Sequence, residues 1–126
     1  MEKKIVEHGG VSIAVVSSRE VIITDGQSAL DFIMTIQYYN NYYNNCLRIA
    51  LNKEALSKEF FILSTGIAGE ILQKFSNYRA KFAIIGDFSS YTSKPLRDFI
   101  YESNRGNTIF FVPDEAAAIE KLSAIK

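Results

Sequence analysis

Two short segments, 64–66 and 87–91, carry the side chains of this chain that are best suited to chemistry. The first has two hydroxyls and a glycine directly before a stretch, 67–75, whose apolar residues recur with helical spacing. A hydroxyl at a helix start caps free backbone N–H groups, and the same position suits an anion or a phosphoryl group. The second segment places a carboxylate beside hydroxyls, groups that could serve acid–base or nucleophilic chemistry. With two arginines that could reach these segments, the candidate ligand-binding or phosphorylation residues are Ser64, Thr65, Gly66, Asp87, Ser89, Ser90, Tyr91, Arg97 and Arg105.

Neither segment completes a catalytic set. His8 is the only histidine, so a hydrolase triad with Asp87 requires His8 to fold beside it. Cys46 is the only cysteine, which excludes an intrachain disulfide and an all-cysteine metal site. The glycines follow neither the Walker nor the GxGxxG spacing. We therefore expect no catalytic residue, metal or cofactor, and the structural alternatives are turn formation by Asp87 and simple helix capping by Ser64 and Thr65.

The composition indicates one soluble domain, 1–126. Apolar residues make up 48% and charged residues 22% of the chain, a balance that suits a single packed core. The 14 basic and 14 acidic residues cancel, so no global field favours nucleic acid or an anionic membrane. No apolar run approaches the roughly 18 residues of a membrane span, and the charged start, 2–4, is unlike a signal peptide. The sequence therefore predicts a cytoplasmic protein without a nucleic-acid or membrane partner.

The N-terminal stretch predicts a β-hairpin. Gly9-Gly10 separates two stretches rich in β-branched residues, 4–7 and 11–16, and paired glycines favour a two-residue turn because both accept a positive φ. Residues 21–23 could add a short further strand.

A first helix is predicted from about Ser28 to about Tyr39. Ser28 and Asp31 have the spacing of a capping box, and the apolar residues that follow share one helical face. The next segment, 38–45, consists of tyrosines and asparagines. We interpret it as a helix end and polar loop, and stacking of its tyrosines on bases or sugars is the alternative.

The remaining chain alternates between strands and helices. Short apolar runs predict buried strands, whereas helical spacing behind a cap or a proline predicts helices. The predicted elements are a strand at 46–51, a turn or a single helical turn at 53–58, a helix at 66–77, a strand at 81–87, a helix starting near Ser93 and Pro95, a strand at 108–112 and a final helix from Pro113. Gly106 is expected as the left-handed cap of the third helix. Inward-facing residues are expected at Leu96, Phe99 and Ile100 of the third helix and at Ala116, Ala117, Ile119 and Leu122 of the last.

These elements define an α/β fold in which a hairpin precedes alternating helices and strands. We expect a mixed sheet with parallel central strands, right-handed crossovers and packed helices. Ligands of such sheets gather at the carboxyl ends of the parallel strands, so 64–66 and 87–91 should emerge there side by side. Gly66 and Gly69 each cost about 1 kcal/mol of helix stability relative to alanine, which suggests close approach of another element or a ligand.

Three stretches have a specific pattern: 61–79 (FILSTGIAGEILQKFSNYR), 86–89 (GDFS) and 96–106 (LRDFIYESNRG). They resemble the signature of a bacterial family known only as a domain of unknown function, number 4180. The resemblance covers most of the chain from about Leu63 onward. Because that family is uncharacterised, the resemblance implies no particular activity.

The element order and the segment Leu63-Ser64-Thr65-Gly66 are also similar, more loosely, to STAS domains, the anti-sigma-factor antagonist fold. That family also opens with strands, and it carries an Asp-Ser-x-Gly motif at the start of its second helix. In this chain Leu63 stands at the position of the aspartate. The resemblance implies a STAS-like fold in which Ser64 occupies the position that a partner kinase phosphorylates.

The leading hypothesis is a non-enzymatic regulatory or protein-interaction domain of STAS-like type. Its working surface would comprise 64–66 and 87–91, and a phosphate on Ser64 would add about two negative charges and change which partner fits. The alternative is a module that binds a small ligand or anion with the same two segments. An enzyme ranks third, because it needs a second titratable group beside Asp87. A protein partner is therefore expected, and a homodimer remains open.

Overall fold

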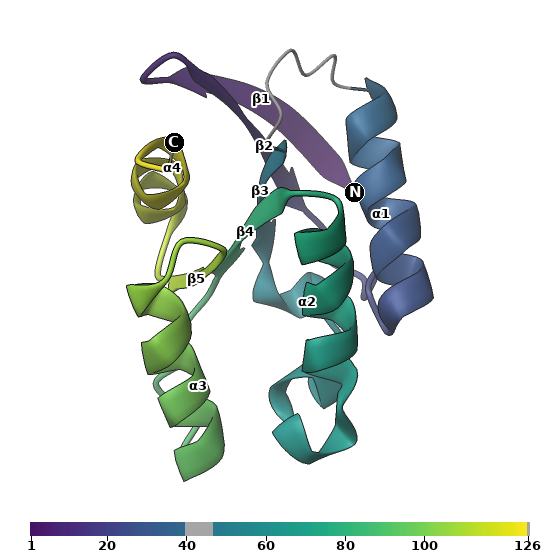
Figure 1. Ribbon diagram of the computed structural model, residues 1–126, viewed down its shortest axis with the longest axis vertical. Helices are drawn as coiled ribbons and strands as arrows, with labels where there is room; N and C mark the ends of the chain where they lie inside the picture. Colours follow the sequence, from purple (N-terminus) through teal and green to yellow (C-terminus); the bar gives the residue numbers. More distant parts are fainter. Residues whose placement is uncertain (40–46, 126) are drawn as a thin grey trace.

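The computed structural model describes residues 1–39 and 47–125 and shows one mixed sheet covered by helices (Figure 1). β1 (Glu2–His8) and β2 (Val11–Ser17) form an N-terminal hairpin. Its turn requires Gly9 and Gly10, because their φ angles of +61° and +83° would strain a residue with a Cβ. The predicted hairpin is confirmed. Parallel strands follow at β3 (Leu47–Asn52), β4 (Ala80–Ile85) and β5 (Ile109–Val112).

The strands lie in the order β1-β2-β3-β4-β5, so each crossover moves the chain one strand in the same direction. Right-handed crossovers in one direction place their helices on the same face of a sheet. Accordingly, α1 (Gly26–Tyr39), α2 (Ile67–Asn77) and α3 (Lys94–Arg105) pack on one face and α4 (Glu115–Ser123) on the other (Figure 1). The predicted α/β class, parallel central strands and packed helices are confirmed.

Alternation of side chains along the strands gives the two faces different cores. On the three-helix face, the rings of Phe75 in α2 and Phe82 in β4 stack with centroids 4.2 Å apart, and both are almost fully buried. On the opposite face, the paired residues Ala50 and Ala83 lie under α4. Small residues at these two positions let a short helix pack close to the sheet.

Arg48 of β3 is buried beneath the end of α4. Its Nε donates to the carbonyl oxygen of Leu122 at 2.9 Å, and its Nη2 donates to that of Ile125 at 2.6 Å. The last carbonyls of a helix lack intrahelical partners and carry the negative end of the helix dipole. The guanidinium therefore supplies hydrogen bonds, from inside the molecule, to carbonyl groups at the C-terminal end of α4.

The start of α1 differs from the prediction. The carboxylate of Asp25 accepts the N–H of Ser28 at 2.9 Å, so Asp25 is the capping residue. The predicted capping box of Ser28 and Asp31 is wrong, because Asp31 accepts a hydrogen bond from the Gln27 side chain instead. The Ser28 backbone N–H, followed by its hydroxyl, holds the pKa of Asp25 below its ordinary value.

The later helices follow the prediction in part. Ser93 caps α3 by accepting the N–H of Leu96 at 3.5 Å, as predicted, and Leu96, Phe99 and Ile100 do face inward. Gly106 is not a left-handed cap, since its φ is −90°. In α4, the buried residues are Ala118 and Leu122, whereas Ala116, which was expected inside, is exposed.

Residues 21–23 do not form a strand. Ile23 makes one isolated parallel bridge to Leu56, and the N–H groups of Ile22 and Ile23 both donate to the carbonyl oxygen of Ala55. This pairing ties the stretch before α1 to the segment after β3. Most of the Tyr/Asn-rich segment, and Cys46, lie outside the described residues.

Candidate binding cleft

An open cleft of about 610 Å³ lies where the parallel strands end. One wall comes from 53–62, which follows β3 as two short 3-10 turns, and the other comes from 90–96, which leads from β4 into α3. Because the strand order never reverses, this sheet has no switch-point crevice of the usual α/β kind. The connecting segments therefore build the cleft. Its apolar lining residues are Val21, Leu56, Phe61, Ile62, Tyr91 and Leu96.

Aromatic rings join the two walls. Phe61 stacks on Tyr91 with centroids 5.0 Å apart and planes 20° apart. Phe88 lies behind them, 6.2 Å from Phe61 and 5.9 Å from Tyr91, and meets the core ring of Phe111 edge-on at 5.3 Å. The ring cluster thus fixes the 87–91 loop against the first wall and anchors it to the core.

Lys53 brings a positive charge to this cluster. A Cβ at Gly86 would lie 2.5 Å from the Lys53 Cδ, so the glycine makes room for the lysine stem. Lys53 Nζ donates to the carbonyl oxygen of Asp87 at 2.6 Å and lies 5.2 Å from the centroid of the Tyr91 ring. At this distance the ammonium is attracted to the face of the ring.

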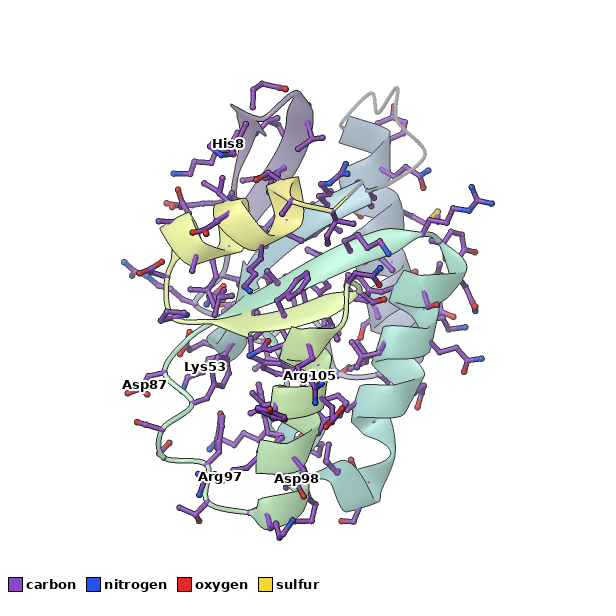
Figure 2. All side chains as sticks on the ribbon, turned by 60° about the vertical axis from the view of Figure 1, so that its left-hand side comes forward. His8, Lys53, Asp87, Arg97, Asp98 and Arg105 are labelled. Atoms are coloured by element: carbon purple, nitrogen blue, oxygen red, sulfur yellow. The ribbon has the colours of Figure 1, made fainter. Side chains whose placement is uncertain are left out.

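Asp87 acts as a turn former at this edge. Its Oδ1 accepts the N–H of Ser89 at 2.9 Å, and its side chain is exposed beside Lys53 (Figure 2). The Ser89 hydroxyl and then the Ser89 N–H, with a smaller contribution from the Lys53 charge, hold the pKa of Asp87 below its ordinary value. Asp87 therefore stays ionised at neutral pH. His8 lies on the hairpin at the other end of the molecule, too far to form a catalytic pair with Asp87 (Figure 2).

Gly66, not Ser64 or Thr65, holds the cap position of α2, although the Thr65 hydroxyl still accepts the first N–H of the helix. Leu63–Thr65 forms a 3-10 turn, and Gly66 occupies the cap position in a left-handed conformation, without a side-chain cap. The Thr65 hydroxyl lies 2.8 Å from the carbonyl oxygen of Ile62 and accepts the N–H of Ile67 at 3.2 Å, so it stabilises the turn. Ser64 is exposed. The segment 64–66 is not part of the cleft lining, and it adjoins the cleft through its chain neighbour Ile62.

The close approach expected at the glycines of α2 is absent among the described residues. A Cβ at Gly66 or at Gly69 would meet no atom within 4 Å. Gly66 is explained by its φ of +79°, and Gly69 lies exposed in the first turns of the helix.

We therefore predict opposite effects of two matched substitutions. Gly66→Ala should lower the free energy of unfolding by about 1–2 kcal/mol, because a Cβ is strained at positive φ. Gly69→Ala should raise it by about 0.5–1 kcal/mol, since alanine is the better helix former and nothing obstructs the added methyl. Urea denaturation of both variants measures the two changes in the free energy of unfolding. If both substitutions changed it in the same direction, the assigned backbone conformations of Gly66 and Gly69 would be contradicted.

The structure unites only some of the predicted site residues. Ser90 and Tyr91 line the cleft, whereas Arg97 does not, and Arg105 lies over the ring of Tyr101 near the end of α3, 5.6 Å from its centroid. Lys53 was missed, although it directly follows a parallel strand. The other lining residues that were not predicted as site residues are Val21, Glu54, Leu56, Lys58, Phe61, Ile62, Thr92, Ser93 and Leu96. One feature of the sequence could have indicated the cleft: the apolar pair at 61–62 lies in a connecting segment rather than in a strand.

Residues 1–39 and 47–125 contain no cluster of three or more His, Cys, Asp or Glu side chains able to hold a metal ion. In the same ranges, every helix is too short or too polar to cross a membrane.

Within residues 1–39 and 47–125, fold and site define an α/β protein with a mixed five-stranded sheet, four α-helices and a cleft at the carboxyl edge of the strands. The chain belongs to the family described as Domain of unknown function (DUF4180), whose model matches residues 8–122. The resemblance to that family is thereby confirmed. Comparison with curated proteins and with solved structures found no match.

Proposed function

We propose that the chain is a non-enzymatic regulatory domain that binds a protein partner through the cleft. One observation carries the proposal: Val21 and Ile62, which line the cleft, are 49% and 52% exposed. Large apolar side chains that gather at the surface around a hollow are typical of a site that another protein covers. A pocket that binds only a small ligand does not need exposed apolar side chains, such as those of Val21 and Ile62, around its opening.

The STAS-like architecture is part of this proposal. It is supported by the hairpin followed by alternating helices and strands, and by the position of Ser64 in the turn before α2. The same proposal includes a cytoplasmic location, which fits the absence of a membrane-crossing helix from the described residues.

Ser64 is the proposed switch. It is exposed and lies two residues from Ile62 on the cleft rim, so a modifying enzyme can reach it. A phosphate there would be favoured by the positive end of the α2 dipole. It would also place a strongly hydrated charge beside the apolar rim. We therefore expect phosphorylation to weaken the binding of an apolar partner segment.

Ser64→Ala should bind the partner as the wild type does, and Ser64→Asp should bind about fivefold more weakly, a loss of roughly 1 kcal/mol. Captured partner can be quantified by mass spectrometry over a series of bait concentrations. Ser76→Asp is the matched control, because Ser76 is exposed at the opposite end of α2. Identical binding by wild type, Ser64→Ala and Ser64→Asp would rule out the switch.

A small anionic ligand is the second candidate, and it is favoured by the cleft's volume and by its two lining lysines, Lys53 and Lys58, which outnumber the one lining carboxylate, Glu54. About 610 Å³ falls within the usual 300–1,000 Å³ range of ligand pockets, and Lys53 supplies a positive charge beside the rings. A thermal-shift panel of nucleotides and phosphorylated metabolites tests it, because a ligand at 100 times its Kd adds about 2.7 kcal/mol of stability. The stabilisation should be lost in Lys53→Met, and a broad panel without a hit would count against this function.

A further inference from the structure

The charged residues that line the cleft differ in how far the chain itself uses them. Lys53 donates through Nζ to the carbonyl oxygen of Asp87 at 2.6 Å, and the Oε1 of Glu54 accepts the side-chain amide of Asn52 at 3.3 Å. Lys58 is exposed and makes no hydrogen bond or ion pair in the part of the chain that the structure describes. The cleft therefore offers a ligand an ammonium group that has no partner among the described residues.

Lys58 belongs to the aromatic wall of the cleft. It begins the 3-10 turn Lys58–Phe61, in which side chains three residues apart lie one above the other, so Lys58 and Phe61 share the side that faces the cleft. Glu59 lies about 120° further round the turn and is not among the residues that line the cleft. Ile62 follows the turn directly and is 52% exposed. The unpaired ammonium group thus lies on the same short wall as the exposed apolar rim.

The opposite wall is uncharged. Its lining residues between 90 and 96 carry no carboxylate and no cation, and the exposed hydroxyls of Ser90 and Thr92 have no hydrogen-bond partner within the described chain. Such hydroxyls can bond the peptide groups of a bound segment, since they both donate and accept. Over the whole lining, two lysines outnumber one glutamate, so the cleft favours a negatively charged segment over a positively charged one.

We propose that the part of the protein partner that enters the cleft is an apolar segment with an acidic residue, whose carboxylate pairs with Lys58. This inference rests on the proposed function, the binding of a protein partner. The apolar side chains of the segment cover Val21 and Ile62 and exclude water from around the ion pair. The attraction between the two charges is stronger there than in open water, whereas a basic segment brings a like charge to Lys58.

Selection from a random peptide display library on the purified protein tests this inference. Peptides selected on the wild type should carry aspartate or glutamate beside large apolar residues. Peptides selected on Lys58→Glu should carry lysine or arginine in that place, because the charge that they meet is reversed. Lys121→Glu is the matched control. Lys121 is exposed on α4, on the other face of the sheet, so its reversal should leave the selected sequences unchanged (Figure 1).

A second measurement quantifies the contact with one selected peptide. Replacing its acidic residue by the corresponding amide should weaken binding to the wild type about tenfold, measured by fluorescence anisotropy. The same replacement should leave the affinity for Lys58→Met unchanged, because this variant keeps an apolar stem and lacks the charge. Equal weakening with both proteins would overturn the inference.

The outcomes separate this inference from the proposed function on which it rests. Tyr91→Ala removes a ring from the cleft, so peptides that lose affinity for this variant bind there. Cleft-binding peptides without an excess of acidic residues, or with the same sequences on Lys58→Glu, would overturn the inference and leave the proposed function standing. A library that yields no cleft-binding peptide would overturn both.

Discussion

Tyr91→Ala should weaken partner binding at least about 30-fold, a loss of 2 kcal/mol or more. The ring of Tyr91 stacks on Phe61 and lies beneath the Lys53 ammonium, so its removal deletes the contact between the two cleft walls. Aromatic side chains at the centre of an apolar site commonly dominate binding energy. The affinity of the captured partner for purified protein can be measured by isothermal titration calorimetry.

Tyr101→Ala is the matched control for this prediction. Tyr101 is 63% exposed on α3 and lies outside the cleft lining. Its replacement should change partner affinity by less than about twofold. The melting temperatures of both variants show whether they remain folded. Equal losses of affinity in two folded variants would contradict the assignment of the cleft as the binding surface.

Phe82→Ala should lower the free energy of unfolding by about 3–5 kcal/mol. Phe82 is fully buried in β4, and the whole stability of a domain this size is about 5–15 kcal/mol. The lost ring leaves a cavity beside Phe75, against which it stacks at 4.2 Å. Urea denaturation measures the loss as a lower midpoint at an unchanged slope.

Phe82→Leu supplies the comparison for this substitution. Leucine fills much of the same space, so the loss should stay below about 1.5 kcal/mol. A cost of less than about 1 kcal/mol for Phe82→Ala would show that the ring is not part of the core.

Local features of the fold were predictable because their causes lie within a few residues. The hairpin follows from Gly9-Gly10 and its flanking β-branched residues, and the start of α3 follows from Ser93 ahead of a proline. Helix ends were less predictable where neighbouring residues compete. Asp25, not Ser28, caps α1, and Gly106 adopts an extended backbone although its sequence context is typical of a left-handed cap.

The cleft was not predictable, since its parts meet only in the folded chain. Val21 precedes α1, Phe61 lies in a 3-10 turn and Tyr91 follows β4, and no periodic pattern links these segments. The sequence placed 87–91 correctly at the carboxyl edge of the strands. It could not show that the neighbouring wall comes from 53–62, because that depends on how two 3-10 turns redirect the chain after β3.

Site-specific photo-crosslinking in living cells tests most directly whether the cleft is a protein-binding surface. A benzophenone amino acid would replace Val21, Ile62 or Tyr101 in turn, all three of which are exposed in the single chain. We predict adducts with the same partner from the two rim positions, 21 and 62, and none from Tyr101. Adducts from Tyr101 alone, or equal adducts from all three positions, would contradict the assignment.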